Sequence, residues 1–524
     1  MMAAEPKSTS TRAVQDTARL FGARMAAGAI SVFFTGWLLR LIPAEDLGVW
    51  PIALALGAAV EGISSLGMGD TFVRRIPRYL AEGRSADAGA LLRTGLLLNV
   101  VAAIIATTLL VAYPDWAARH ILRDPSKASL VTNLGLVVLA IAVQKRLQWG
   151  LQATQQFNHI AILSLFTHIG LAPLGVLLYL HYGMAGLLAA FAIVPAIAAV
   201  ATVVWLWPHL WIGGGLRPLG DLLQFSAPFY GVSLLGFLQG RAHYLVVGLL
   251  TTPEVLAVYF VASKVSDYVR ELDGFGISAI TPKFAERGGV EEGARPRIMA
   301  KCSRYVFLVL MPMHLGVAAL AKPITHLYAG SDYTQASVIL AILSLYGFVE
   351  LLHNLHRAQV QIYSPPVHLL GLQAIAAVLN VAAIGLLVWV WGAMGAAVAR
   401  LAVYVLLTAV AAKILSRTMP LRYDWRAARG GIQAGVLMVG ACVAVAALLP
   451  GAVAPVLVGI ALGVLVFVAA LRGYVSEDDV DLVMRTVPSR LGSFWIVQKL
   501  GTFLQAWLVP SVPEKPAPAG GGAE

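Results

Sequence analysis

EVLAVYFVASKVSDYVRELD, residues 254–273, begins as mostly apolar sequence and then places several charged side chains within about three helical turns. These residues are Lys264, Asp267, Arg270, Glu271 and Asp273, and apolar sequence lies on both sides of them. Inserting an Arg or Lys near the bilayer centre costs roughly 2.5–3.5 kcal/mol, so such residues normally face a polar cavity. The pattern therefore predicts a transport pathway. The alternative is a set of buried ion pairs that only hold helices together.

The composition predicts a chain that crosses a membrane many times. Of 524 residues, 59% are hydrophobic and 12% are charged, whereas roughly 25% charge is usual in soluble domains. Apolar runs of about 20 residues, enough to span a bilayer of about 30 Å, recur along almost the whole chain. We predict an all-α integral membrane protein with about fourteen transmembrane helices. The predicted spans are 14–42, 47–77, 88–113, 130–155, 158–181, 184–208, 219–250, 254–284, 300–329, 334–363, 367–391, 394–416, 428–449 and 452–472.

Two short segments indicate an internal duplication. Residues 45–53 read EDLGVWPIA and residues 254–262 read EVLAVYFVA, so that Glu, Leu, Val, an aromatic residue and Ala coincide 209 residues apart. Six predicted spans lie within that offset, so both copies enter the membrane in the same direction. We therefore predict two pseudo-symmetric lobes of six helices, residues 14–210 and 217–417, with two extra helices in 425–473.

The distribution of the net charge of +11 indicates which side of the membrane each connection lies on. Lys and Arg gather in connections that all lie on one side if the N-terminus is cytoplasmic. We expect both termini in the cytoplasm and no nucleic-acid partner. The clusters are Arg74, Arg75, Arg78 and Arg84; Lys145 and Arg146; Arg295, Arg297, Lys301 and Arg304; and Lys413, Arg417, Arg422, Arg426 and Arg429.

Arg241 and Lys264 are predicted to share one layer of the membrane. Arg241 lies about ten residues before the turn near Thr252 and Lys264 about eleven residues after it, which puts both roughly 15 Å below that surface. Two cations in one layer would attract an anionic ligand. In the alternative, Asp267 neutralises Lys264 from three residues away.

The 209-residue offset also relates Glu61 to Arg270. The two residues should lie at equal depth on opposite lobes, and if both point inward we expect them to pair across a cavity between the lobes. The predicted substrate-binding residues are Arg241, Lys264, Arg270 and Glu61.

The tenth predicted span carries a second polar stripe. Tyr346, Glu350, His353 and Arg357 recur at helical spacing and share a face. A carboxylate and an imidazole one turn apart can carry a coupling proton. Candidates for ion or proton coupling are Asp267, Asp70, Glu350, His353 and Arg357.

Other chemistries find little support in the sequence. There is no phosphate-binding Gly-rich loop, and the two cysteines, Cys302 and Cys442, have no metal-ligand or disulfide spacing. We predict no cofactor, no metal and no enzymatic activity. A single intramembrane histidine such as His168 or His314 is expected only to form hydrogen bonds within the bundle.

The two ends of the chain are predicted to lie outside the membrane. Residues 1–13 form a polar cytoplasmic tail, and the first apolar stretch is too long for a signal peptide. Residues 476–509 contain a capping box and an amphipathic pattern typical of interfacial helices. Residues 510–524, rich in Pro, Gly and Ala, are typical of a disordered tail.

Several of these segments resemble a known family. Residues 66–76, LGMGDTFVRRI, are similar to the end of the second helix in the polysaccharide transporter branch of the multidrug, oligosaccharidyl-lipid and polysaccharide exporter superfamily, to which O-antigen flippases belong. Asp70 is unusual at its position. Residues 241–264 resemble the seventh and eighth helices of the family, and Pro282 falls where a proline is common. His243 departs from the acidic residue that many relatives carry, so an ion-coupling role is not expected at that position.

The resemblance implies a function. Members of this branch flip undecaprenyl-pyrophosphate-linked oligosaccharides across the bacterial inner membrane by alternating access, using two lobes and cationic cavities. The implied partners are the lipid-linked oligosaccharide, membrane lipid, H+ or Na+, and the polymerase and glycosyltransferases of surface polysaccharide assembly.

Two other functions remain open. A cation-coupled drug or metabolite antiporter of the same superfamily would favour cavity carboxylates over cavity cations. A membrane-integral polymerase or ligase would need a longer periplasmic loop than any predicted here.

Overall fold

A computed structural model of the protein describes residues 28, 30–212, 215–217, 219–287, 294–363, 366–417 and 421–475, and in this part of the chain the only regular structure is helical. The all-α prediction is confirmed. The predicted N-terminal tail 1–13, the beginning of the first span, the interfacial helices 476–509 and the tail 510–524 lie outside the described residues.

The first lobe begins with the helix Ile30–Leu41. Its other helices are α2 (Ala44–Leu47), α3 (Val49–Ser64), α4 (Met68–Ala81), α5 (Ser85–Val111), the short α6 (Pro114–His120), α7 (Ala128–Ala153) and the long α8 (Phe157–Leu210). The predicted second span, 47–77, is interrupted between α3 and α4, where Leu66 and Gly67 have φ of 47° and 73°.

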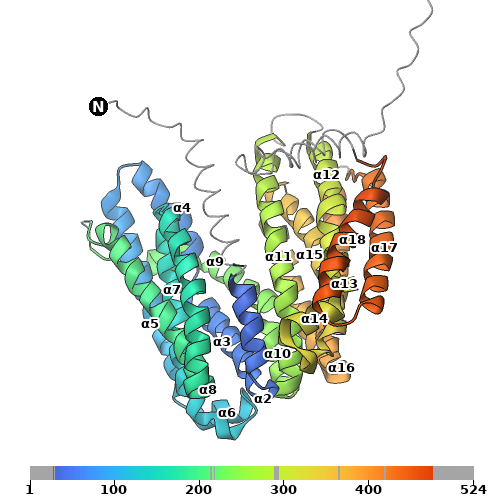
Figure 1. Ribbon diagram of the computed structural model, residues 1–524. Coiled ribbons are helices and arrows are strands. Elements are labelled where there is room, and N and C mark those ends of the chain that lie inside the picture. The colour runs from blue at the N-terminus through green and yellow to red at the C-terminus, as the bar shows by residue number, and fades with distance from the viewer. Residues whose placement is uncertain are drawn as a thin grey trace, which may run out of the picture.

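The second lobe comprises α9 (Leu219–Gly240), α10 (Ala242–Leu250), α11 (Pro253–Arg287), α12 (Ala294–Tyr305), α13 (Met311–Ala319), α14 (Ala321–Ala329), α15 (Ala336–Tyr363) and α16 (Pro366–Ser416). A π-helical turn, Val306–Leu310, joins α12 to α13. The helices α17 (Trp425–Leu448) and α18 (Val453–Ala470) follow and lie at the outer edge of this lobe (Figure 1).

The number of spans agrees with the prediction. Among the described residues, nine helices are long and apolar enough to cross a membrane, and the bent pair α9–α10 makes up to ten. Two of these, α8 and α16, each consist of two helices joined at a glycine with non-helical backbone angles. Counting α8 and α16 as two spans each brings the number to twelve. The helix α11, which carries too many charges to be counted above, and the helix Ile30–Leu41 bring it to about fourteen.

The same glycine turn occurs at equivalent points of the two lobes. Gly183 has φ 60° and ψ −143°, and Gly392, 209 residues later, has φ 58° and ψ −140°. Three residues after each turn, a Cβ on Gly186 would lie 2.0 Å from the carbonyl oxygen of Leu178, and one on Gly395 would lie 1.9 Å from that of Leu387. This separation of 209 residues is the same as that between the similar segments 45–53 and 254–262. The internal duplication therefore extends to the backbone conformation of the glycine turn.

The two lobes touch at one end of the molecule and diverge toward the other. They meet near the end that holds α6 and α14 and separate toward the end of α4 and α12 (Figure 1). At the closed end the Trp50 ring lies 5.4 Å from that of Phe260, and a Cβ on Gly48 would meet the Pro253 backbone at 2.8–2.9 Å. In a membrane, where lipid is as apolar as Leu, small residues that permit such close approach are a main source of helix association.

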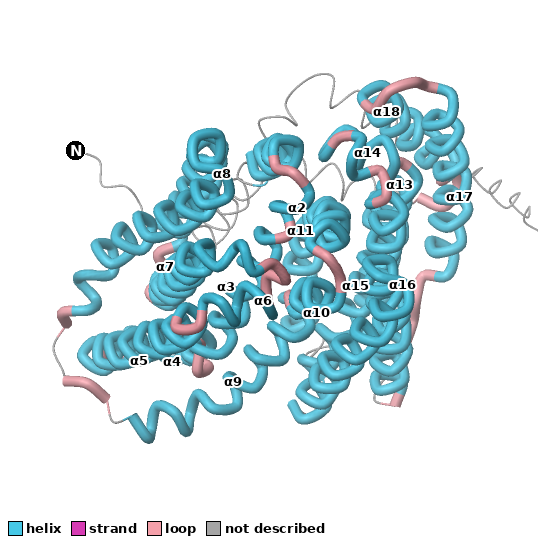
Figure 2. Tube along the Cα trace, turned by 90° about the horizontal axis from the view of Figure 1, so that it is seen from below, coloured by secondary structure: helices cyan, strands magenta, loops and turns pink. Residues whose placement is uncertain are grey.

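Helix α9 connects the lobes. Near its beginning, the backbone of Ser226 and Tyr230 lies so close to Gly67 that a Cβ there would be 2.2 Å from the Ser226 oxygen. At its end, Gln239 donates from Nε2 to the carbonyl of Gln373 in α16 at 2.8 Å. Seen from below, α9 runs from the first lobe toward the second (Figure 2).

Candidate functional site

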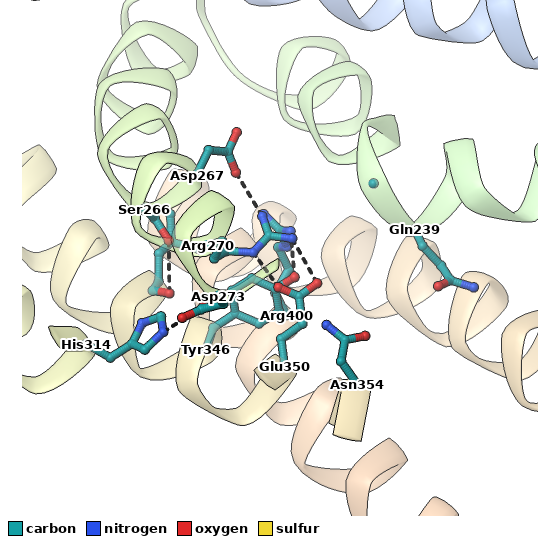
Figure 3. A network of polar contacts seen from close by, with 12 residues as sticks. Gln239, Ser266, Asp267, Arg270, Asp273, His314, Tyr346, Glu350, Asn354 and Arg400 are labelled. Carbon is teal, nitrogen blue, oxygen red and sulfur yellow. Dashed lines mark hydrogen bonds and ion pairs between the residues drawn. The ribbon is translucent and has the colours of Figure 1, made fainter. Parts of the chain in front are cut away.

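The charged half of α11 is the centre of a polar network inside the second lobe. Side chains of α11 and α15 meet there, with a contribution from α16 (Figure 3) and from Arg241 at the break between α9 and α10. Helical spacing puts Asp267 and Arg270 on one face of α11, because residues three apart are neighbours on the helix surface.

Arg270 forms the strongest contact of the network. It donates from Nη2 to Oε1 of Glu350 on α15 at 2.8 Å and from Nε to the other carboxylate oxygen. Its Nη1 donates to Asp267 at 2.8 Å. The Arg270 side chain is 25% exposed and that of Glu350 is 12% exposed. A two-point contact between a guanidinium and a carboxylate is both strong and directional, so it fixes α11 against α15.

Arg241 reaches the same network from the break between α9 and α10. The helix ends at Gly240, Arg241 has non-helical angles of φ −131° and ψ −17°, and the two helices are bent by 49°. Its Nη1 lies 3.5 Å from Asp267 Oδ2, and 44% of its side chain is exposed. Asp267 is therefore shared between Arg241 and Arg270. The sequence also allowed Asp267 to neutralise Lys264. In the structure, Asp267 pairs with the two arginines.

Lys264 is half-buried beside this network. Within the described ranges, no carboxylate lies within ion-pair distance of its Nζ. The ammonium instead lies 5.7 Å from the ring centre of Phe260 and 6.0 Å from that of Tyr268. The faces of aromatic rings attract a cation through the ring quadrupole, so Lys264 is held here without an ion pair to any described carboxylate.

Arg400 of α16 is a member of the network that the sequence reading missed. Its side chain is almost fully buried, and it donates from Nη2 to the Tyr346 hydroxyl at 2.8 Å. Its guanidinium carbon lies 4.3 Å from the Tyr346 ring centre, and that of Arg270 lies 5.4 Å from the same ring. Arg400 is the one arginine of the apolar twelfth predicted span, so the cost of burying its charge in lipid could have identified it, as it did Lys264.

Glu61 lies in the first lobe, and the pairing with Arg270 that we expected is not present. Its carboxylate is 4.0 Å from Nη1 of Arg146 on α7. Nη2 of Arg146 donates to the Ser64 hydroxyl at 2.6 Å and to the Glu61 carbonyl at 2.5 Å. Glu61 and Arg270 each have their nearest charged partner within their own lobe, Arg146 for Glu61 and Glu350 for Arg270, and no ion pair joins Glu61 to Arg270.

The other predicted coupling residues lie apart from this centre. Asp70 is exposed in the first turn of α4. His353 is buried and its ring packs 5.4 Å from that of Tyr404 on α16. Arg357 donates to Asn354 at 3.3 Å. Of the stripe on α15, only Tyr346 and Glu350 contact the network, because the helix rises about 1.5 Å per residue and the later residues of the shared face lie farther along its axis. In the part of the chain that the structure describes, no group of three or more metal-ligating side chains occurs.

Two similar helical lobes, joined at one end and carrying buried charge in a bilayer-spanning bundle, define a membrane transporter. Residues 37–338, more than half of the chain, match the family described as "Polysaccharide biosynthesis protein", and the chain belongs to this family. It is a member of the multidrug, oligosaccharidyl-lipid and polysaccharide exporter superfamily, as the resemblance implied. No curated protein sequence matches it.

Solved structures share the fold. The lipid II flippase MurJ in an inward closed conformation has a TM-score of 0.65 and 13% identity, with 87% of this chain and 98% of that chain covered. The inward-facing multidrug resistance transporter of the MATE family has a TM-score of 0.60 and 13% identity, with 75% and 98% covered. A transporter from Pyrococcus furiosus, with a binding pocket of reverse polarity, has a TM-score of 0.53 and 12% identity, with 76% and 95% covered.

Proposed function

We propose that this protein is a flippase that moves a polyprenyl-pyrophosphate-linked oligosaccharide across the bacterial inner membrane by alternating access, for surface polysaccharide assembly. The observation that supports this most is the pairing of Arg241 and Arg270 with one carboxylate, Asp267, together with Lys264 one turn earlier on α11. A pyrophosphate is an anion that binds several such donors at once, and charge-assisted hydrogen bonds to it are strong in a site with little water.

The charge balance supports an anionic substrate over a cationic one. Asp267 and Glu350 are both engaged by arginines, whereas Lys264 has no carboxylate within ion-pair distance in the described ranges. The alternative function, a cation-coupled drug or metabolite antiporter, needs carboxylates that a cation can reach. It is therefore the weaker of the two.

The arrangement of the lobes supports a direction of opening. The end at which they diverge carries Arg74, Arg75 and Arg78 of α4 and the following Arg84. An excess of Lys and Arg marks the cytoplasmic side of a membrane protein. In our proposal this end is cytoplasmic, both chain termini are cytoplasmic, and the site is loaded from the cytoplasm. A polymerase and glycosyltransferases would act before and after the flip, and H+ or Na+ is the candidate coupling ion.

The test is a flipping assay with the purified full chain in liposomes. The probe is a fluorescent polyprenyl-pyrophosphate disaccharide, and its appearance in the opposite leaflet is followed by membrane-impermeant quenching. We expect Arg241→Ala and Lys264→Ala each to lower the rate roughly ten- to a hundredfold, since a hydrogen bond to a charged group contributes about 1.5–3 kcal/mol. Lys413→Ala, a charge removed from an exposed position on α16, is the matched control.

Normal flipping by both variants would refute the assigned site. If the wild-type protein leaves the probe in its original leaflet but expels a cationic dye when an ion gradient is applied, the antiporter function is the correct one.

A further inference from the structure

Asp273 and His314 form a second buried charged pair that the network above does not use. Oδ2 of Asp273 on α11 lies 2.9 Å from Nε2 of His314 on α13, and the two side chains are 6% and 1% exposed. Figure 3 shows the pair beside the Arg270–Glu350 contact. The sequence reading treated His314 as a structural residue only, because nothing in the sequence relates it to Asp273.

Each member of the pair has a buried polar atom that finds no hydrogen-bond partner among the described residues. These atoms are Asp273 Oδ1 and His314 Nδ1. Buried polar groups are nearly always satisfied, so an exception indicates an unseen water or ion, or a group that changes state during function. An imidazole nitrogen and a carboxylate oxygen are both proton acceptors.

The pair can exist in two charge states. With a neutral imidazole donating from Nε2 to an ionised carboxylate, it carries one negative charge. One added proton gives either an imidazolium beside a carboxylate or an imidazole beside a carboxylic acid, and both are neutral. A low-dielectric interior makes this difference of one charge large for every ionised neighbour.

The ionised neighbours belong to the proposed transport site. On α11, Arg270 lies one turn before Asp273, with Asp267 beyond it. On α15, Glu350 holds Arg270. Tyr305 at the end of α12 is the titratable neighbour from that helix.

A glycine on α15 brings the pair and the transport site into contact. A Cβ on Gly347 would lie 2.6 Å from His314 Cε1 and 3.4 Å from Arg270 Cγ. The His314 ring and the Arg270 stem therefore pack over the same glycine. The π-helical turn Val306–Leu310 lies one turn before His314, and such turns are common at functional sites in helices.

We propose that Asp273 and His314 form a proton-binding site that couples proton movement to transport. Loss of the proton leaves a carboxylate that competes with Asp267 and Glu350 for Arg270. Binding of the proton removes that competitor and leaves Arg270 in the contacts described above. This inference rests on the proposed transport function for its coupling step, but not for the binding of the proton itself.

The first experiment measures proton binding directly, without any substrate. Infrared difference spectra of the full chain in liposomes are recorded between pH 8 and pH 5, and the carboxyl band that appears on protonation is titrated. We expect one band, or one histidine signal, to disappear in both Asp273→Asn and His314→Gln. The control Asp332→Asn, at an exposed position of the 3-10 turn Ser331–Tyr333, should match the wild type. A titration that is unchanged in both variants would overturn the site.

The second experiment measures coupling with the flipping probe. A pH gradient should change the wild-type rate several-fold, and this response should be absent in His314→Gln, which still donates a hydrogen bond to Asp273 and so retains the contact between α11 and α13. A gradient response that survives in His314→Gln would refute the coupling. If the wild type does not flip the probe at all, the proposed function fails, while the titration still decides whether the proton site exists.

Discussion

Arg270 of α11 holds the carboxylate of Glu350 on α15 through two nitrogen donors, across 80 residues of sequence. The same guanidinium donates to Asp267 on its own helix. One cation thus organises two carboxylates in the interior of the second lobe. Each carboxylate can therefore be replaced separately, and the effect of its loss on Arg270 can be measured.

Glu350→Gln should destabilise the second lobe by about 1.5–3 kcal/mol, because a hydrogen bond between charged groups is replaced by a weaker one to a neutral amide. The measurement is the thermal unfolding midpoint in detergent. The double variant Arg270→Gln with Glu350→Gln should recover part of the loss, since it leaves no uncompensated charge in this contact. Strict additivity of the two single losses would contradict the pair described here.

Asp267→Asn should strengthen the binding of an anion to the site. The change removes the carboxylate that Arg241 contacts at 3.5 Å, so that Arg241 and Lys264 are both available to a phosphate. We expect the affinity for polyprenyl pyrophosphate in liposomes to rise roughly tenfold, which corresponds to about 1.4 kcal/mol, and release to become slower. Weaker binding in this variant would mean that Asp267 contacts the ligand directly.

Gly67→Ala should disrupt the contact between the α3–α4 junction and α9. Gly67 has φ 73°, and its Cβ would lie 2.2 Å from the Ser226 oxygen and 2.7 Å from the Tyr230 nitrogen. Gly83→Ala is a matched control, because Gly83 has the same φ of 73° and nothing within 4 Å of its Cβ position. The control should cost only the roughly 1–2 kcal/mol of a left-handed backbone. Equal unfolding midpoints for the two variants would argue against this packing.

Gly347→Ala should separate His314 from Asp273. The new methyl group would lie 2.6 Å from the imidazole, so the ring must move. We expect loss of the proton-binding signal assigned to the pair, together with a lower unfolding midpoint. Gly371→Ala on α16, where nothing lies within 4 Å, should be neutral or slightly stabilising, as is usual for Gly to Ala in a helix. A proton signal that persists in Gly347→Ala would show that the ring tolerates the methyl group.

The sequence by itself determined the features that depend on local composition. The length of apolar runs predicts the spans, since a bilayer of about 30 Å requires about 20 residues whatever the neighbours are. The repeated segments at residues 45 and 254 predict the two lobes. The cost of charge within lipid singles out Lys264 and Arg270 before any fold is known.

Only the tertiary structure decided which charges meet. Glu61 pairs with Arg146 and Arg270 with Glu350, and His314 meets Asp273 across 41 residues. Such choices depend on the rotation of each helix about its axis and on its distance from helices remote in the chain. Periodicity along one helix defines a face, but it cannot say which other face lies opposite. Close packing at glycines such as Gly347 sets those rotations, because a single methyl group there would separate the partners.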